Sequence, residues 1–423
     1  MPLMSSWVDS ANAPDCPFPL NNLPYGVYSL GDNEPVCCTA IGGFALDLAQ
    51  LERGGLIDAG GEPVFATSAL NDFMSLGQGS WDAVRNQLTD LLEEGADANS
   101  RGAVKVAMTA LSEVKMLMPF RVTEFTDFFS GRNHAENAGT MFRGRENALQ
   151  PNWLHIPVAY NGRASTVVVS GTDIVRPKGQ LKSPKHEVPI FAPSRRLDIE
   201  LEMGAIVGTP STMGQPVSVD EADVMIFGYV ILNDWSASDI QAWEYQPLGP
   251  FQAKAFATSI SPWVVTRAAL EPFRTSTPER EKELLPYLQE NSPMLFDIDL
   301  EVAMQPAGSG AETVISQTNY GEMYYSAAQQ LAHHSSSGCA MNCGDLLGSG
   351  TISGPDKSSL GSLLEISWGG KEPFTLDSGE TRTFIEDGDR MTLRGHAQGD
   401  GYRIGFGECT ATILPAQIET GGS

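Results

Sequence analysis

The sequence predicts an α+β protein in which β-structure dominates, with a small N-terminal unit followed by a larger β-rich domain. Beyond about residue 120 the chain is rich in glycine and proline and contains many short segments of alternating polarity, with few helical patterns. This arrangement favours a mostly β domain over a repeated βαβ array. Pro119 ends the last helical pattern of the first unit, so we place the domains at 1–119 and 120–423.

The N-terminal unit is expected to contain short strands followed by helices. Segments around 26–30, 37–42 and 43–48 have the length and composition of strands. A helix capped by Ser80 and stopped by Gly95 should follow. Its apolar residues recur at helical spacing: Trp81, Val84, Leu88, Leu91 and Leu92. A second helical pattern aligns Val104, Met108 and Leu111 before Pro119.

Composition excludes several classes of partner. The 423 residues include 27 basic and 52 acidic side chains, a net charge of -25, which would repel nucleic acids and anionic membrane surfaces. The first residues lack a basic leader, and no run of about 18 apolar residues could span a bilayer. Six cysteines in a chain of this length indicate reduced, packed thiols. We therefore expect a cytoplasmic protein that binds neither nucleic acid nor membrane.

The most informative segment is the alternating stretch 196–203. A strand would place Leu197, Ile199, Leu201 and Met203 on one face and Asp198, Glu200 and Glu202 on the other. Neighbouring carboxylates destabilise a strand unless a cation offsets them, and hard divalent cations prefer oxygen ligands. The alternative interpretation is a solvated face of an amphipathic strand.

Two other segments supply further carboxylates. The apolar run 226–232 predicts a buried strand that ends at Asp234, and Asp127 precedes His134 by seven residues. The four oxygen donors Asp127, Glu200, Glu202 and Asp234 could therefore form one calcium or magnesium centre beside a histidine. Manganese also suits such ligands. Cys339 and Cys343 lack the second pair that a zinc site would need.

Motifs along essentially the whole chain resemble those of the fumarylacetoacetase family. They are Asn22–Val27, Asp127–His134, Met141–Gly144, Asn152–His155, Gly162–Ser165, Leu197–Met203, Asn233–Ser236, Trp243–Tyr245, Pro247–Phe251, Thr258–Val265, Gly350–Gly354 and Gly399–Arg403. The resemblance implies an N-terminal SH3-like barrel, a C-terminal mixed β-sandwich roll and a homodimer. It also implies hydrolytic cleavage of a carbon–carbon bond in a small β-diketo or enol acid, as in the last step of tyrosine catabolism.

The resemblance assigns roles to individual residues. It places calcium ligands at Asp127, Glu200, Glu202 and Asp234, the set that strand periodicity and chain position also indicate. The general base falls on His134, which a carboxylate at Glu365 would hold in one tautomer. Taken alone, Glu365 would be an ordinary strand residue. The remaining positions fall into three groups. Lys254 and Gln241 match groups that stabilise developing negative charge; Arg143, Tyr160, Tyr245 and Thr351 match substrate contacts; Lys254 and Thr258 match a second metal site.

Two substrate-pocket positions depart from the family pattern. Ser238 stands where the family has arginine, and Phe129 stands where it has tyrosine. Because serine does not replace a bidentate guanidinium, we expect an altered substrate or reaction. Drift without consequence is the alternative for these two positions. For the function as a whole, the alternatives are a non-hydrolytic biosynthetic enzyme (decarboxylation, isomerisation, dehydration or carbon–carbon bond formation through a metal enolate) and a non-catalytic binding protein.

Overall fold

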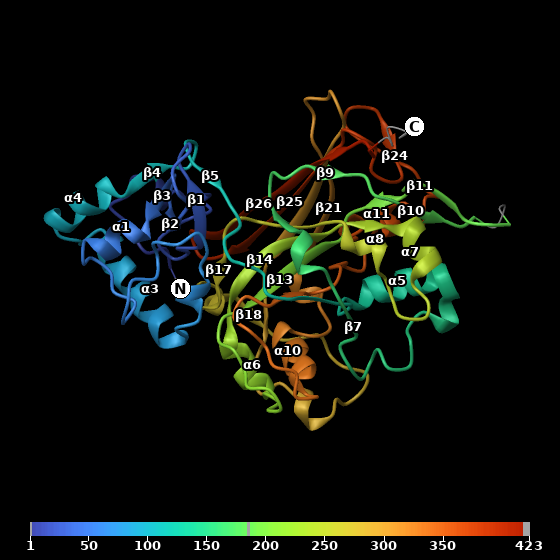
Figure 1. The fold of residues 1–423 in the computed structure, drawn as a ribbon, viewed down its shortest axis with the longest axis horizontal. Helices are drawn as coiled ribbons and strands as arrows, with labels where there is room; N and C mark the ends of the chain where they lie inside the picture. Colours follow the sequence, from blue (N-terminus) through green and yellow to red (C-terminus); the bar gives the residue numbers. More distant parts are fainter. Residues whose placement is uncertain (1, 184–186, 418–423) are drawn as a thin grey trace, which may run out of the picture.

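The computed structural model describes residues 2–183 and 187–417. Figure 1 shows the N-terminal unit on the left and the larger unit, in green to red, on the right. Sheets dominate the architecture, with one eight-stranded and two five-stranded sheets among the described residues. The predicted β-rich class is confirmed at this level.

The N-terminal sheet is antiparallel and has the order β4-β3-β2-β1-β5. Its strands are β1 (Tyr25–Ser29), β2 (Val36–Ile41), β3 (Phe44–Asp47), β4 (Met108–Ala110) and β5 (Lys115–Met116). Four helices accompany them: α1 (Leu48–Arg53), α2 (Asn71–Met74), α3 (Gln78–Leu92) and α4 (Ala98–Val106). The first three strands lie where the sequence predicts them, while the SH3-like barrel stays a prediction.

The two helices that the sequence predicts in the N-terminal unit, α3 and α4, differ in detail from the prediction. Helix α3 begins at Gln78 after Gly77, whose φ of 82° suits glycine, so Ser80 lies inside the helix rather than at its cap. Helix α4 ends at Val106, and Met108 belongs to β4, where it pairs with Leu46 of β3. The prediction that Met108 and Leu111 continue a helix is wrong because a ladder to a distant strand overrides local periodicity.

Two sheets form the frame of the larger unit. One has the order β7-β6-β22-β13-β14-β16-β8 with β17 paired to β14, and the other has the order β21-β20-β25-β26-β9. The first contains β6 (Phe125–Phe128), β7 (Ala159–Asn161), β8 (Val167–Val169), β13 (Leu201–Val207), β14 (Ile226–Asp234), β16 (Thr258–Ile260), β17 (Val265–Thr266) and β22 (Leu346–Gly348). The second contains β9 (Ile174–Val175), β20 (Asp299–Gln305), β21 (Thr313–Asn319), β25 (Arg390–Gln398) and β26 (Arg403–Leu414).

Shorter elements complete this unit. Two-stranded ladders are β10 (Lys178–Leu181) with β11 (Ile190–Pro193), β12 (Leu197–Asp198) with β15 (Ser236–Ala237), β18 (Arg274–Thr275) with β19 (Leu295–Phe296), and β23 (Phe374–Thr375) with β24 (Thr381–Arg382). The helices are α5 (Arg132–Arg143), α6 (Val219–Met225), α7 (Ser238–Glu244), α8 (Gln252–Ala255), α9 (Arg267–Leu270), α10 (Ala327–Ser335) and α11 (Leu363–Ile366). Helices α5, α7, α8 and α11 gather at the right of Figure 1.

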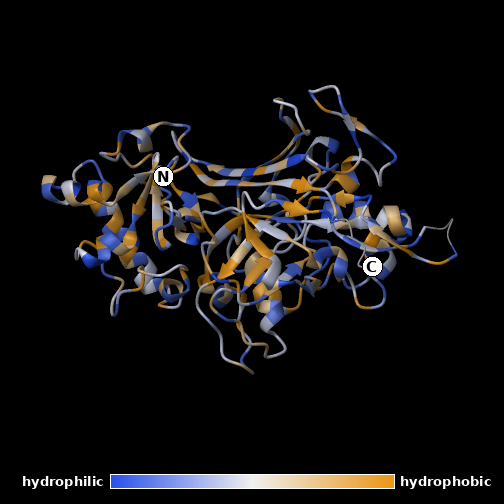
Figure 2. Ribbon diagram, turned by 45° about the horizontal axis from the view of Figure 1, so that its top comes forward, coloured by the Kyte–Doolittle hydropathy of each residue, from blue (hydrophilic) through white to orange (hydrophobic). Residues whose placement is uncertain are grey.

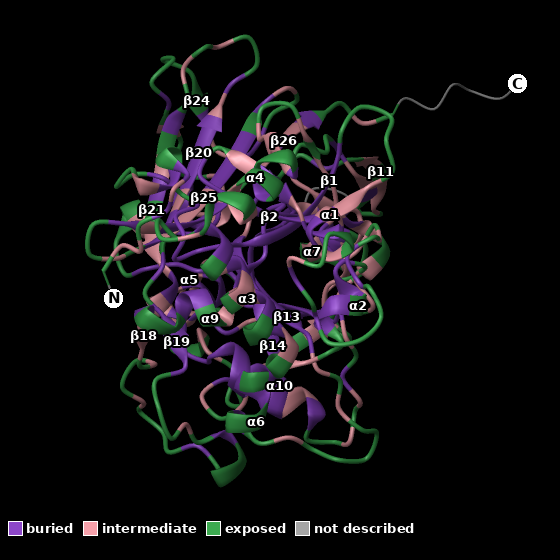
Figure 3. Cartoon of the chain, turned by 90° about the vertical axis from the view of Figure 1, so that its left-hand side faces the viewer, coloured by how far each residue is buried: buried purple, intermediate pink, exposed green. Residues whose placement is uncertain are grey.

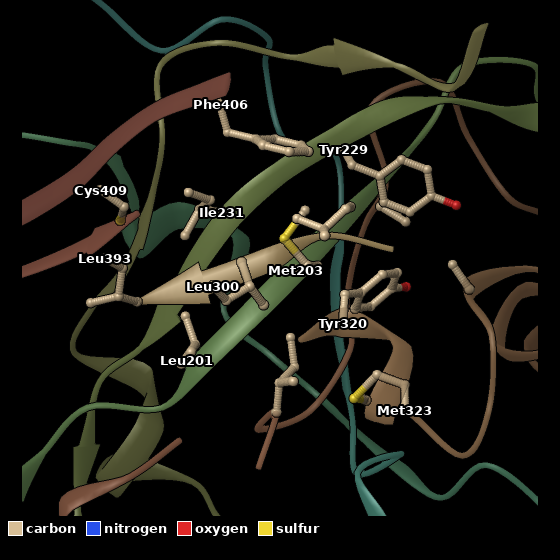
Figure 4. Packing of buried hydrophobic residues seen from close by; sticks show 14 of the residues in the cluster. Leu201, Met203, Tyr229, Ile231, Leu300, Tyr320, Met323, Leu393, Phe406 and Cys409 are labelled. Atoms are coloured by element: carbon tan, nitrogen blue, oxygen red, sulfur yellow. The ribbon is translucent and has the colours of Figure 1, made fainter. Parts of the chain in front are cut away.

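The central strands β13 and β14 are buried on both faces. One face carries Leu201, Met203 and Ile231, which pack against Leu300, Leu393 and Phe406 of the second sheet (Figure 4). The opposite face joins the hydrophobic core of the N-terminal unit. Hydrophobic strands therefore run through the middle of the molecule in Figure 2, and the same strands are buried in Figure 3. Burial on both faces explains why residues 226–232 form a continuous apolar run.

The two units are also joined by the backbone. Tyr25 N donates to Val264 O over 2.9 Å, and Val264 N donates to Tyr25 O over 2.8 Å. The central sheet is thus supported from both sides, which fixes the ends of β6, β13 and β14.

No helix in the part of the chain that the structure describes is long and apolar enough to cross a membrane.

Candidate functional site

The acidic segment 196–203 is not one continuous strand. It divides into β12 and β13, with Ile199 and Glu200 between them. Leu197, Ile199, Leu201 and Met203 all pack in the core between the two large sheets, as the alternation predicts. The opposite face splits: Glu200 and Glu202 enter the carboxylate cluster, while Asp198 accepts hydrogen bonds from the backbone of α11.

Four carboxylates converge at one end of the large sheet. Asp127, Glu200, Glu202 and Asp234 each offer an oxygen, and these oxygens lie within 4.8 Å of one another. Asp127 lies next to the last residue of β6, Glu202 is the second residue of β13, and Asp234 is the last residue of β14. Since β6, β22, β13 and β14 are neighbours in the sheet, residues distant in sequence meet at this edge.

The strand between the ligands carries no side chain at the cluster. Gly348 of β22 pairs with Asp127 of β6 and with Gly204 of β13. A Cβ atom at Gly348 would lie 2.6 Å from Asp127 Oδ1 and 2.8 Å from Glu202 Oε2. Glycine at this position therefore leaves the space that the carboxylates face.

Two carboxylate oxygens of the cluster lack hydrogen-bond donors, as expected of oxygens that bind a cation. Asp127 Oδ1 and Glu202 Oε1 are buried oxygens without a hydrogen-bond partner. Burial and neighbouring carboxylates raise the pKa of both groups well above their usual values. Buried oxygens without donors are costly unless a positive charge compensates them. The residues present thus suit a hard divalent ion with oxygen ligands.

Other groups hold the remaining oxygens. Lys254 Nζ lies 2.7 Å from both Glu200 Oε2 and Asp234 Oδ2. Burial opposes its charge, but Asp234 and Glu200 outweigh burial and raise the pKa of Lys254. Thr258 Oγ1 donates to Asp234 Oδ1 over 2.9 Å. The ammonium of Lys254 therefore bridges two carboxylates of the cluster. The second metal site implied at Lys254 and Thr258 stays a prediction.

A histidine–glutamate pair lies beside the cluster. His134 is in the first turn of α5, and its Nδ1 lies 2.6 Å from Glu365 Oε2. Burial opposes the imidazolium, but the charge and hydrogen bond of Glu365 outweigh burial and raise the pKa of His134. Because Glu365 holds Nδ1, Nε2 is the nitrogen left to exchange a proton. Glu365 lies on the one-turn helix α11 and not on a strand, so that prediction is wrong.

Three polar side chains that the sequence does not single out donate to Glu365. Asn137 Nδ2 donates to Oε1 over 2.9 Å, while Ser353 Oγ and Ser362 Oγ donate to Oε2 over 2.9 and 2.8 Å. Burial opposes the Glu365 anion, but His134, Asn137 and Ser362 outweigh burial and lower the pKa of Glu365. The Ser-x-x-Glu spacing of 362 and 365 is a capping signature that could have indicated the helix.

The cluster and the histidine open into one cavity of about 310 Å³. Besides Glu200, its lining includes nine of the predicted positions: Asp127, Phe129, His134, Arg143, Tyr160, Ser238, Gln241, Tyr245 and Lys254. Thr351 lies behind Glu200, to which its Oγ1 donates over 3.0 Å. Tyr160 OH donates to Asp234 Oδ2 over 2.9 Å. The structure therefore brings the predicted residues together around one cavity and its carboxylates.

Phe129 and Ser238, the two positions that differ from the expected family pattern, both line this cavity. Phe129 packs edge-on against His134, with ring centroids 5.3 Å apart and planes inclined by 81°. Ser238 opens α7, and its backbone N–H donates to Arg196 O over 3.0 Å. Arg143 remains as a cavity guanidinium, although its Nε and Nη2 already donate to backbone oxygens of Asn147 and Ala148. The cavity therefore presents an apolar ring at Phe129 and a short hydroxyl at Ser238, where the resemblance implies a tyrosine and an arginine.

A buried oxygen-ligand cluster beside a carboxylate-oriented histidine defines a candidate metal-dependent enzyme site. Residues 125–414 match the family model described as fumarylacetoacetate (FAA) hydrolase C-terminal, and residues 21–119 match fumarylacetoacetase N-terminal. The chain belongs to the fumarylacetoacetase family. The predicted resemblance is thus confirmed.

Individual relatives match over nearly their full length. The fumarylacetoacetase of Bos taurus is 48% identical over 410 residues, which cover 96% of this chain and 98% of the relative. That of Arabidopsis thaliana is 45% identical over 422 residues, covering 98% and 100%. A solved fumarylacetoacetate hydrolase from psychrophilic Exiguobacterium antarcticum, 15% identical, covers 93% of this chain and 100% of its own with a TM-score of 0.52. That structure shows a shared fold.

The cluster predicts opposite effects of Glu202→Gln with and without a divalent ion. In EDTA the variant should melt no lower than wild type, because one repelling carboxylate is gone and Gly350 N can still donate to the amide oxygen. Added Ca²⁺ at 100 times its dissociation constant should stabilise wild type by about 2.7 kcal/mol and the variant far less.

Thermal melts with Ca²⁺, Mg²⁺ and Mn²⁺ would measure this difference. The exposed Glu62→Gln exchange is the control, since it removes the same charge away from the cluster. An unchanged Ca²⁺-induced shift in Glu202→Gln would contradict the assignment of Glu202 as a ligand.

Proposed function

We propose that this protein is a metal-dependent hydrolase that cleaves a carbon–carbon bond in a small β-diketo or enol acid. The observation that supports this function is a four-carboxylate cluster beside the His134–Glu365 pair, with Asp127, Glu200 and His134 lining one cavity. Membership of the fumarylacetoacetase family supports the same reaction class. We further propose that the ion is Ca²⁺ or Mg²⁺, with Mn²⁺ as the other candidate.

The residues divide the chemistry between them. An ion held by Asp127, Glu200, Glu202 and Asp234 would act as a Lewis acid toward an oxygen of the substrate. His134 takes a proton from water at Nε2, and Glu365 keeps the ring in the required tautomer. Lys254, buried and charged, offsets negative charge as the bond breaks. Gln241 offers an amide at the same cavity, and Arg143 is the candidate cation for a substrate carboxylate.

The departures at Ser238 and Phe129 support a changed specificity. Removing one oxyanion donor typically costs about 100-fold or more in rate, so the loss of a guanidinium matters. Phe129 adds an apolar ring to the cavity wall. Other apolar side chains in the same lining are Phe128, Phe142 and Leu248. We propose a substrate that is bulkier or less charged than fumarylacetoacetate. A non-hydrolytic reaction through an enolate is the second candidate, because the change at Ser238 alters how the cavity handles negative charge.

We also propose a cytoplasmic homodimer with an SH3-like N-terminal barrel at 1–119 and a β-roll domain at 120–423. Exposed apolar side chains near the cavity support self-association: Leu248 is 94% exposed and Phe251 is 68% exposed. Light scattering tests the dimer against the monomer mass of 45.5 kDa.

His134→Ala should lower the turnover of β-diketo acids by at least about 100-fold, because His134 is the one histidine among the described residues that line the cavity. The bound divalent ion should remain, since His134 is not among the ligands. Glu365→Gln should be milder, because it keeps the shape and weakens only the orientation of the ring.

Initial rates at saturating metal, with ion content from atomic emission, would test the role of His134. His396→Ala is the matched control, since His396 lies on β25 away from the cavity. Substrate turnover by His134→Ala at the wild-type rate would contradict the assignment of His134 as the general base.

Ser238→Arg with Phe129→Tyr should raise the hydrolysis of fumarylacetoacetate and lower turnover of the native substrate, because it restores one cation and one hydroxyl. Wild type should hydrolyse this diketo acid about 100-fold or more below the double variant. Ser238→Asn with Phe129→Tyr is the control, as it adds polarity without charge.

The measurement is the steady-state loss of fumarylacetoacetate by each protein at equal metal saturation. If wild type is already as fast as Ser238→Arg with Phe129→Tyr, the idea of changed specificity fails and an ordinary fumarylacetoacetase remains.

A further inference from the structure

Asp198 is a buried carboxylate that the proposed reaction does not use. Its side chain belongs to a residue that is 2% exposed. It accepts three backbone hydrogen bonds of 2.7 Å: Oδ1 from Leu363 N and Ile199 N, and Oδ2 from Leu364 N. Such a convergence of donors is expensive to lose, because each buried N–H would then lack a partner.

The N–H groups of Leu363 and Leu364 begin the helix that carries Glu365. A helix leaves its first N–H groups without internal partners, so side chains must satisfy them. Asp198 satisfies those of Leu363 and Leu364, and Ser362 Oγ accepts from Glu365 N over 3.3 Å. In a helix of one turn, these contacts decide where the Glu365 carboxylate lies.

Asp198 also ties this helix to the strand that supplies the cluster. Two residues further along the chain, Glu200 forms a β-bridge with Ser362. Leu201 N donates to Gly361 O over 2.9 Å, and Glu202 follows directly. The segment 197–202 therefore contributes Glu200 and Glu202 to the cluster, and Asp198 to the start of the helix that carries Glu365.

We propose that Asp198 is a positioning residue that fixes α11, and through it the His134–Glu365 pair, in register with the carboxylate cluster. Its effect on turnover rests on the proposed role of His134 as base. Its effect on the geometry of the pair does not depend on any reaction. Two readouts therefore separate a failure of this inference from a failure of the proposed function.

The first readout is the ring N–H proton of His134 in protein labelled with ¹⁵N-histidine, without substrate. A bond of 2.6 Å to Glu365 should shift that proton far downfield, and Glu365→Gln assigns the signal. Asp198→Ala should remove or broaden it, and Asp198→Asn should move it upfield. Asp345→Asn is the control: Asp345 is 4% exposed and also accepts a backbone N–H, from Asn342.

The second readout is kinetic. Asp198→Asn should lower kcat about 10-fold and Asp198→Ala about 100-fold, with KM and metal content unchanged, because only the base is displaced. In a Glu365→Gln background, Asp198→Asn should change kcat less than about twofold, since both act through one group.

An unaltered His134 signal in Asp198→Ala would overturn the proposal. So would a full additional 10-fold loss in the Glu365→Gln background, or an equal disturbance of the signal by Asp345→Asn. If none of the tested diketo acids is a substrate, the NMR comparison of Asp198 and Asp345 variants decides alone.

Discussion

The structure of the larger unit depends on the concentration of negative charge at the ends of β6, β13 and β14. Four carboxylates within 4.8 Å cannot all remain charged in a buried place without compensation. Lys254 compensates Glu200 and Asp234, yet oxygens of Asp127 and Glu202 remain unpaired. A divalent ion is the compensation that this donor set suits. The glycine at 348 leaves room for it, and the two cores hold the strand ends in place.

The histidine–glutamate pair is organised from the same strands. Glu365 receives four donors, so it stays anionic and orients His134. Its helix is anchored by Asp198, which lies two residues before the ligand Glu200. Polarisation of a substrate oxygen and activation of water would thus be fixed in mutual register by one segment of backbone. This arrangement places the base without a long loop, which would be free to move.

Sequence reasoning located the carboxylate cluster because strand periodicity and strand ends are local signals. Leu197, Ile199, Leu201 and Met203 share a core face as the alternation required. The alternation could not separate Asp198 from Glu200, because the break between β12 and β13 depends on the bridge to Ser362, far along the chain. The sequence around Glu365 predicts a strand for the same reason, since a one-turn helix is stabilised mainly by distant side chains. Met108 shows the same limit in the N-terminal unit, where pairing with Leu46 replaced a helix.

The central claim is that the four carboxylates form one divalent-ion site, and calorimetric titration of the EDTA-stripped chain tests it most directly. Wild type should bind one Ca²⁺, Mg²⁺ or Mn²⁺ per chain at this site. Gly348→Ala, whose Cβ would lie 2.6 Å from Asp127 Oδ1, should lose that stoichiometry while the protein stays folded by circular dichroism. Binding of one ion per chain with unchanged affinity in Gly348→Ala, or no ion bound by wild type, would contradict the account.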